Sequence, residues 1–98
     1  MFHQPADRIF RRLNMELLII FSEVMATRHA KLAADNLELT QSAVSHGIRR
    51  LSDIVGERLF VRDRFTFTPT LRASEMSPVV DTIVASARSI LVLRTDEA

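Results

Sequence analysis

The segment from residue 41 to residue 55 constrains the fold most, because its two faces differ in kind. Four apolar residues recur at helical spacing and form a stripe that must be buried: Val44, Ile48, Leu51 and Val55. The opposite side carries small or polar residues: Gln41, Ser42, Ser45, His46 and Arg49. A solvated helix face usually contains Lys and Glu, but this segment has no Lys and its acid, Asp53, lies near the end. The pattern predicts a helix that buries one side and lays the other against a partner.

Two shorter helices are predicted before this one. Residues 14–26 carry an apolar face at helical spacing, and Asn14 can cap their first turn. Residues 30–37 predict a second helix, whose core-facing residues would be Leu32, Ala33 and Leu37. The start of this second helix is poorly capped, because no Ser or Asp stands there, although Thr27 can serve.

The hydrophobic period changes once the helix capped by Thr40 ends at Gly56. Residues 57–70 alternate apolar and polar side chains and are rich in β-branched and aromatic types, which predicts a short hairpin turning near Asp63–Arg64. A last helix is predicted over about residues 71–94, longer than so small a body needs to cover. Its long apolar side therefore requires a partner.

Composition limits the class of protein. A chain of 98 residues is enough for one domain, and the absence of cysteine excludes disulfides and thiolate metal sites. No apolar run approaches the roughly 20 residues that cross a membrane, and the first residues lack the apolar core of a signal peptide. We therefore expect a soluble cytoplasmic protein with no membrane partner.

Net charge is only +1, so total charge does not indicate a nucleic-acid partner, but its distribution does. Residues 46–64 contain five arginines against three acids: Arg49, Arg50, Arg58, Arg62 and Arg64 against Asp53, Glu57 and Asp63. Arginine suits planar contact with phosphates and base edges. A solvated surface with a chance bias remains the alternative reading of the charges alone.

The order helix, helix, turn, helix, hairpin is that of a winged helix-turn-helix, a mainly α fold. In such a domain the second helix of the pair lies in the major groove of DNA, which a face of small residues permits. Ser42 and Ser45 would let the backbone approach, and Gln41 could pair with adenine. His46 and Arg49 could reach purine edges or phosphates.

Several motifs in sequence order resemble the DNA-binding domain of LysR-type transcriptional regulators. They are Leu17, Phe21, the Ala33-Ala34 pair, "LTQSAVS", "RRL", "LFVR" and "TPTLRA", and together they cover about residues 13–93. The opening, the wing entry and the last motif are most similar to a branch that includes the nodulation and leucine-operon regulators.

The resemblance implies roles for individual residues. It assigns contacts with bases and phosphates to one set of residues: Thr40, Gln41, Ser42, Ser45, His46, Arg49 and Arg50. It places Arg62 on the wing arginine that enters the minor groove. It makes the helix from Leu71 a linker through which two subunits pair antiparallel, and the target a roughly palindromic site similar to T-N11-A. We expect the homodimer seam to be formed by Met76, Val80, Ile83, Ala87, Ile90 and Leu91.

Three departures from the family pattern stand out. Ser42 replaces the usual Pro, and residues 29–31 read His-Ala-Lys where a capping hydroxyl and a Thr are usual. The wing reads Asp63-Arg64-Phe65-Thr66, without the usual glycine. The wing tip must therefore turn differently, which leaves open whether Arg62 or Arg64 enters the groove.

These observations divide the chain into a flexible arm over residues 1–12, a winged helix-turn-helix over 13–69 and a dimerisation helix over 70–94. Family members carry a further domain of about 200 residues that binds a small effector, so we expect this chain to be the DNA-binding part of a longer protein. No cofactor is expected in the chain itself, and the full-length regulator is expected to be a tetramer.

Other functions compete with DNA binding. An enzyme is disfavoured, because Ser45 and His46 are neighbours on a helix and diverge by about 100°, which prevents a nucleophile–base pair. The histidines at positions 3, 29 and 46 lack metal-binding spacing. A winged helix that binds only protein, or one from another regulator family, stays open. Binding to DNA weakens steeply as salt rises, whereas binding to protein through an apolar interface does not, so salt dependence distinguishes a protein-binding winged helix from a DNA-binding one. The mode of dimerisation distinguishes a winged helix of another regulator family.

Overall fold

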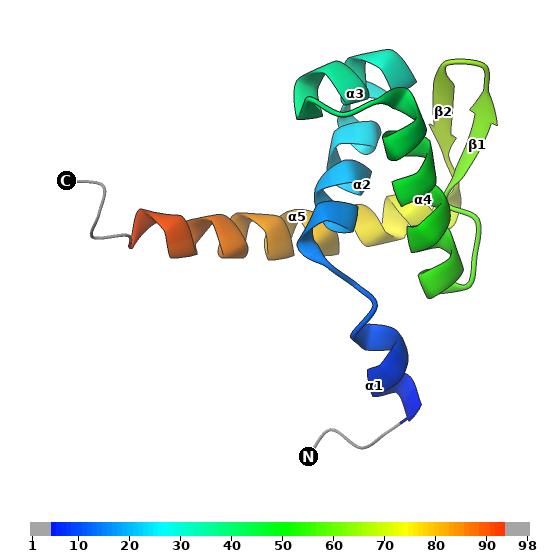
Figure 1. The fold of residues 1–98 in the computed structure, drawn as a ribbon. Helices are drawn as coiled ribbons and strands as arrows, with labels where there is room; N and C mark the ends of the chain where they lie inside the picture. The colour runs from blue at the N-terminus through cyan, green and yellow to red at the C-terminus, as the bar shows by residue number, and fades with distance from the viewer. Residues whose placement is uncertain (1–4, 94–98) are drawn as a thin grey trace.

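A computed structural model describes residues 5–93, and helices dominate it (Figure 1). The elements in chain order are α1 Pro5–Phe10, α2 Met15–Thr27, α3 Ala30–Leu37, α4 Gln41–Val55, β1 Phe60–Asp63, β2 Thr66–Pro69 and α5 Leu71–Val92. β1 and β2 pair antiparallel and form the wing. The architecture is a winged helix-turn-helix followed by a long helix, which confirms the predicted fold class.

α2 is central to the core and packs against α3, α4 and α5. Its first turn is capped as predicted, because the Leu17 amide donates to Oδ1 of Asn14 at 3.0 Å. Phe21 is completely buried and its ring lies 5.7 Å from that of Phe60 on β1. This aromatic contact joins the wing to the helices.

α3 begins and packs differently from the prediction. His29 is the cap, since its Nδ1 accepts the Leu32 amide at 3.3 Å, whereas the Thr27 hydroxyl donates to the Glu23 carbonyl at 3.0 Å. The prediction that Leu32 faces the core is wrong, because 51% of this residue is exposed. α3 buries a face of small residues instead: Ala30, Ala33 and Ala34. These alanines let α3 lie close to its neighbours.

α4 confirms the predicted buried stripe over most of its length. Val44, Ile48 and Leu51 are buried, while Val55 at the end is half-buried. Gly47 is also buried, at the place where α4 faces α2. Gly56 ends the helix with φ at 83°, a left-handed conformation that glycine adopts readily.

The wing turns one residue later than predicted. Asp63 pairs with Thr66, so the turn consists of Arg64 and Phe65. Arg64 has φ at 55°, which is costly for a side chain with a Cβ atom and is usually occupied by Gly or Asn. Phe67 on β2 is buried, with its ring 5.6 Å from that of Phe60.

The turn between α2 and α3 holds the wing along its second strand. The Ala30 amide donates to the Phe65 carbonyl at 2.7 Å, and the Phe67 amide donates to the Arg28 carbonyl at 3.0 Å. The imidazole of His29 stacks on the ring of Phe65 with 6.1 Å between centroids. The wing is therefore tied to the start of α3 by backbone bonds as well as by its packing on the core.

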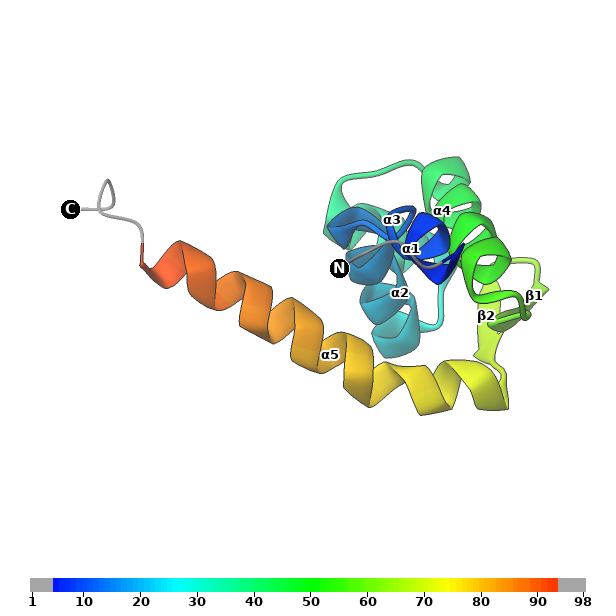
Figure 2. The ribbon, with the colours of Figure 1, turned by 90° about the horizontal axis from the view of Figure 1, so that it is seen from below.

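α5 lies against the body with one half and projects from it with the other (Figures 1 and 2). Thr70 caps it, and the Ser22 hydroxyl on α2 donates to Oδ1 of Asp81 at 3.2 Å. Pro78 lies inside the helix. The axis of α5 bends along its length in Figure 2, and proline is a common cause of such a bend. Residue 94, the predicted end, lies outside the described residues.

The proposed dimer seam is only partly available to a partner. Val80 is 3% exposed and belongs to the core of its own chain, so its assignment to the seam was wrong. Met76 is half-buried against the same core, and Ala87 is also half-buried. The exposed members of the predicted set lie farther along the helix: Ile83, Ile90 and Leu91. The dimer residues were predicted from helical spacing alone. Spacing does not show where along α5 the contact with α2 ends.

The segment predicted as an irregular arm contains α1, a helix over Pro5–Phe10. Proline suits a first helical position, because no hydrogen-bonded amide is needed there. The large apolar residues Ile9 and Phe10 are exposed, so they form no buried stripe that a sequence pattern could have revealed. Residues 1–4 lie outside the described part of the chain.

Candidate nucleic-acid interface

The polar side of α4 faces outward, as predicted. Its exposed residues are Ser42, His46, Arg49 and Arg50, and its half-buried ones are Gln41 and Ser45. Thr40 is the N-cap of the helix, because its hydroxyl oxygen accepts a hydrogen bond from the Ala43 amide at 3.0 Å. The first half of α4 thus presents small and basic side chains together with the positive end of the helix dipole.

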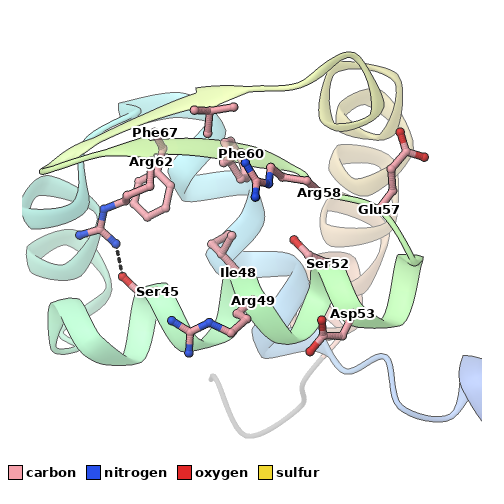
Figure 3. A pocket seen from close by; sticks show the side chains of 11 residues that line it. Ser45, Ile48, Arg49, Ser52, Asp53, Glu57, Arg58, Phe60, Arg62 and Phe67 are labelled. Atoms are coloured by element: carbon pink, nitrogen blue, oxygen red, sulfur yellow. Dashed lines mark hydrogen bonds between the residues drawn. The ribbon is translucent and has the colours of Figure 1, made fainter.

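A groove runs between α4 and the wing (Figure 3). Its volume is about 600 Å³, and side chains of Ile48, Phe60 and Phe67 line it together with polar residues. A second hollow of about 630 Å³ lies over the start of α4, lined by Gln41, Ser42 and His46 among others. Both hollows include Ser45, Arg49 and Arg62, so these three residues lie where the two meet.

Arg62 reaches from β1 across this groove to α4 (Figure 3). Its Nη1 donates to the hydroxyl of Ser45, and its Nε donates to the Arg64 carbonyl at 2.7 Å. Its guanidinium carbon lies 4.6 Å from the centroid of the Phe67 ring, a cation–π contact. The side chain is therefore held by the helix, the wing turn and the second strand together.

Charge is unevenly distributed along the groove. Arg49 and Arg62 lie toward the start of α4, whereas the acids Asp53 and Glu57 lie toward its end together with Arg58 (Figure 3). Nε of Arg72 lies 3.9 Å from a carboxylate oxygen of Glu57, so that acid has a cationic neighbour on α5. An anion is attracted to the end of the groove beside Ser45, where the arginines and the helix N-terminus coincide.

Sequence reasoning brought Gln41, Ser42, Ser45, His46 and Arg49 to one face correctly, but it did not find the contact between the wing and α4. Ser45 and Arg62 are 17 positions apart, and no local pattern indicates that they meet. It also missed the position of His29 beside the wing turn. The only sequence feature that pointed to it was a histidine at the start of α3, where a capping Ser or Asp is usual.

Within residues 5–93, no group of three or more His, Asp or Glu side chains is placed to hold a metal ion. In the same range, no helix is both long and apolar enough to cross a membrane.

The fold and the outward face of α4 define a winged helix-turn-helix protein. Residues 15–73 match the model of the bacterial regulatory helix-turn-helix proteins, lysR family, and the chain belongs to that family. It is 38% identical over 68 residues to the transcriptional regulator PhcA of Ralstonia nicotianae, and 40% identical over 74 residues to HdfR of Escherichia coli. These matches cover 69% and 76% of the chain but only 20% and 26% of the two relatives.

Solved structures show the same fold. PA0477 from Pseudomonas aeruginosa aligns with a TM-score of 0.76 at 30% identity, over 85% of this chain and 28% of that one. The BenM_DBD complex with benA site 1 DNA aligns with a TM-score of 0.75 at 18% identity, over 83% of this chain and 91% of that one. At 18% identity, the likeness to BenM_DBD concerns the fold alone.

Proposed function

We propose that this chain is the DNA-binding part of a bacterial transcriptional regulator and binds double-stranded DNA sequence-specifically. The observation that carries the proposal is the outward face of α4. Its first half bears only small, polar and basic side chains, and it lies beside a wing that carries two further arginines. The lysR family match over residues 15–73, and relatives such as PhcA and HdfR that are transcriptional regulators, support the same function.

In this proposal α4 enters the major groove. Gln41 reads base edges, and His46 and Arg49 contact purine edges or phosphates. Ser42 and Ser45 are small enough to let the helix approach, and Arg50 contacts the backbone. The wing, with Arg62 and Arg64, lies at the neighbouring minor groove.

We further propose a homodimer through α5. The projecting half of the helix exposes several large apolar residues, including Ile83, Ile90 and Leu91. Such a stripe is stable when a second helix covers it. Two recognition helices related by a two-fold axis then require a roughly palindromic site, similar to T-N11-A, with half-sites about one helical turn apart.

The relatives are longer than this chain, so the whole protein's behaviour is also part of the proposal. We propose that a further domain binds a small-molecule effector, that the full-length regulator assembles as a tetramer, and that it works in the cytoplasm. The chain described here would need no cofactor and catalyse no reaction.

Selection of bound sequences from random DNA tests the proposal. A dyad should be enriched, and affinity for it should fall steeply as salt rises, because phosphate contacts release counterions. A protein-interaction module without DNA readout would enrich nothing. A single asymmetric half-site bound with full affinity would contradict the dimer while leaving DNA binding intact.

A further inference from the structure

The contacts of Arg62 distinguish it from an arginine that is free to enter a DNA groove. Its guanidinium bonds to Ser45 on α4 and to the backbone carbonyl of Arg64, and it lies over the Phe67 ring. Entry into a groove beyond the wing would break contacts with three different segments. The side chain is exposed, so nothing but these contacts sets its direction.

The wing turn provides a second arginine in a different situation. Arg64 is exposed at the tip, and its carbonyl is the acceptor of the Arg62 Nε–H bond. Its φ is 55°, and the carbonyls of residues 64 and 65 accept hydrogen bonds from Arg62 Nε and the Ala30 amide. No hydrogen bond or ion pair holds the Arg64 side chain to other residues in the part of the chain that the structure describes.

We infer that Arg62 is a positioning residue that fixes the wing against the recognition helix, and that Arg64 supplies the cation for the minor groove. This inference rests on the proposed DNA-binding function. Ser45 is then the anchor of the wing on α4, and it joins the two DNA-contacting elements into one rigid surface. Of the two wing arginines between which the sequence does not decide, this inference assigns the minor groove to Arg64.

The first test measures the free protein and needs no DNA. The Nε–H of Arg62 should exchange with water more slowly than that of Arg49, which has no hydrogen-bond partner among the described residues. Replacing Phe67 by Leu, which removes the ring under the guanidinium, should speed the exchange at Arg62 and leave Arg49 unchanged. Equal exchange at both arginines in the unmodified protein would overturn the positioning role, whether or not the chain binds DNA.

The second test compares affinities for sites with A·T-rich and G·C-rich flanks. Narrow A·T-rich minor grooves attract arginine, so the unmodified protein should prefer the A·T flanks. Arg64→Asn removes the cation but tolerates a left-handed backbone, and it should bring the ratio of the two affinities to about one. Arg64→Lys should keep much of the preference. If Arg64→Asn keeps the full ratio, the assignment of the groove cation is wrong.

Arg62 should behave in the opposite way. Arg62→Lys and Arg62→Ala should lose affinity for both kinds of flank by similar factors and keep their ratio, because lysine lacks the planar guanidinium whose Nε and Nη1 reach the Arg64 carbonyl and Ser45 separately. Combining Ser45→Ala with Arg62→Lys should cost little more than either change, as expected for two partners in one contact. Additive losses, or rescue by lysine, would overturn the inference. If the unmodified protein binds neither site, the proposed function fails instead.

Discussion

Gly47 on α4 lies against the side chain of Ile20 on α2. A Cβ atom at position 47 would be 2.7 Å from Cδ1 of Ile20, which is closer than carbon atoms approach. Cδ1 is the end of the Ile20 side chain, so this buried side chain would have to turn to admit a Cβ atom. The missing side chain of Gly47 therefore sets how closely the recognition helix packs on the central helix.

Gly47→Ala should destabilise the protein by about 1 kcal/mol. Overpacking costs about 1–3 kcal/mol, and the better helix propensity of alanine offsets about 1 kcal/mol of this. Ile20→Val removes the clashing atom, so Gly47→Ala should cost less in that background. Urea unfolding of the four proteins measures the coupling, and a more stable Gly47→Ala in the native background would contradict the packing argument.

His29→Ala should lower the free energy of unfolding by about 1 kcal/mol, because the first turn of α3 loses its cap. His29→Asn supplies another acceptor for the Leu32 amide and should recover most of this loss, although it removes the stacking on Phe65. Chemical denaturation distinguishes the two. If the Asn variant is as unstable as the Ala variant, the ring contact and not the cap is what His29 contributes.

Gln41→Ala and Arg49→Ala should each lose about 1–3 kcal/mol of binding free energy on the specific site, and much less on unrelated DNA. Arg88→Ala is the control, since Arg88 is exposed on the projecting part of α5. Binding is measured at a fixed salt concentration on both DNAs. Equal losses on the two DNAs would mean that these side chains contact phosphates and do not read sequence.

Ile83→Asp should separate the dimer without unfolding the chain, because Ile83 is 42% exposed and adjoins the projecting half of α5. Val80→Asp, only three positions away, should instead unfold the domain, since it buries a charge without a partner. Sedimentation gives the assembly state, and circular dichroism gives the fold. A native protein that sediments as a monomer at tens of micromolar would contradict the proposed dimer.

Much of the fold could be predicted because its signals are local. The caps at Asn14, Thr40 and Thr70 act within one turn, and the buried stripe of α4 repeats at helical spacing. The change of period after Gly56 marked the wing to within one residue at its turn. These features depend on neighbouring residues, which the sequence displays directly.

The rest depends on contacts between distant segments. Leu32 is a large apolar residue of the kind found in cores, but it is exposed, because α3 packs through its alanines. Val80 and Ile83 lie on one predicted stripe, yet only the three-dimensional path of α5 decides which of them meets α2. For the site, the face of α4 was predicted, while the anchoring of Arg62 by Ser45 required knowing where the hairpin folds back.

The backbone bonds between the wing and the α2–α3 turn limit how such domains can be recombined. A hairpin grafted from a relative would meet the same backbone carbonyl at residue 28 and amide at residue 30, but it would fit them only if it matched the local path of residues 28–30 and the ring of His29 that stacks on Phe65. A working chimera would have to transfer residues 28–30 together with residues 60–69, although about thirty positions separate them. The unit that can be exchanged between two such proteins is therefore discontinuous in sequence, and a crossover placed between α3 and α4 would cut it in two.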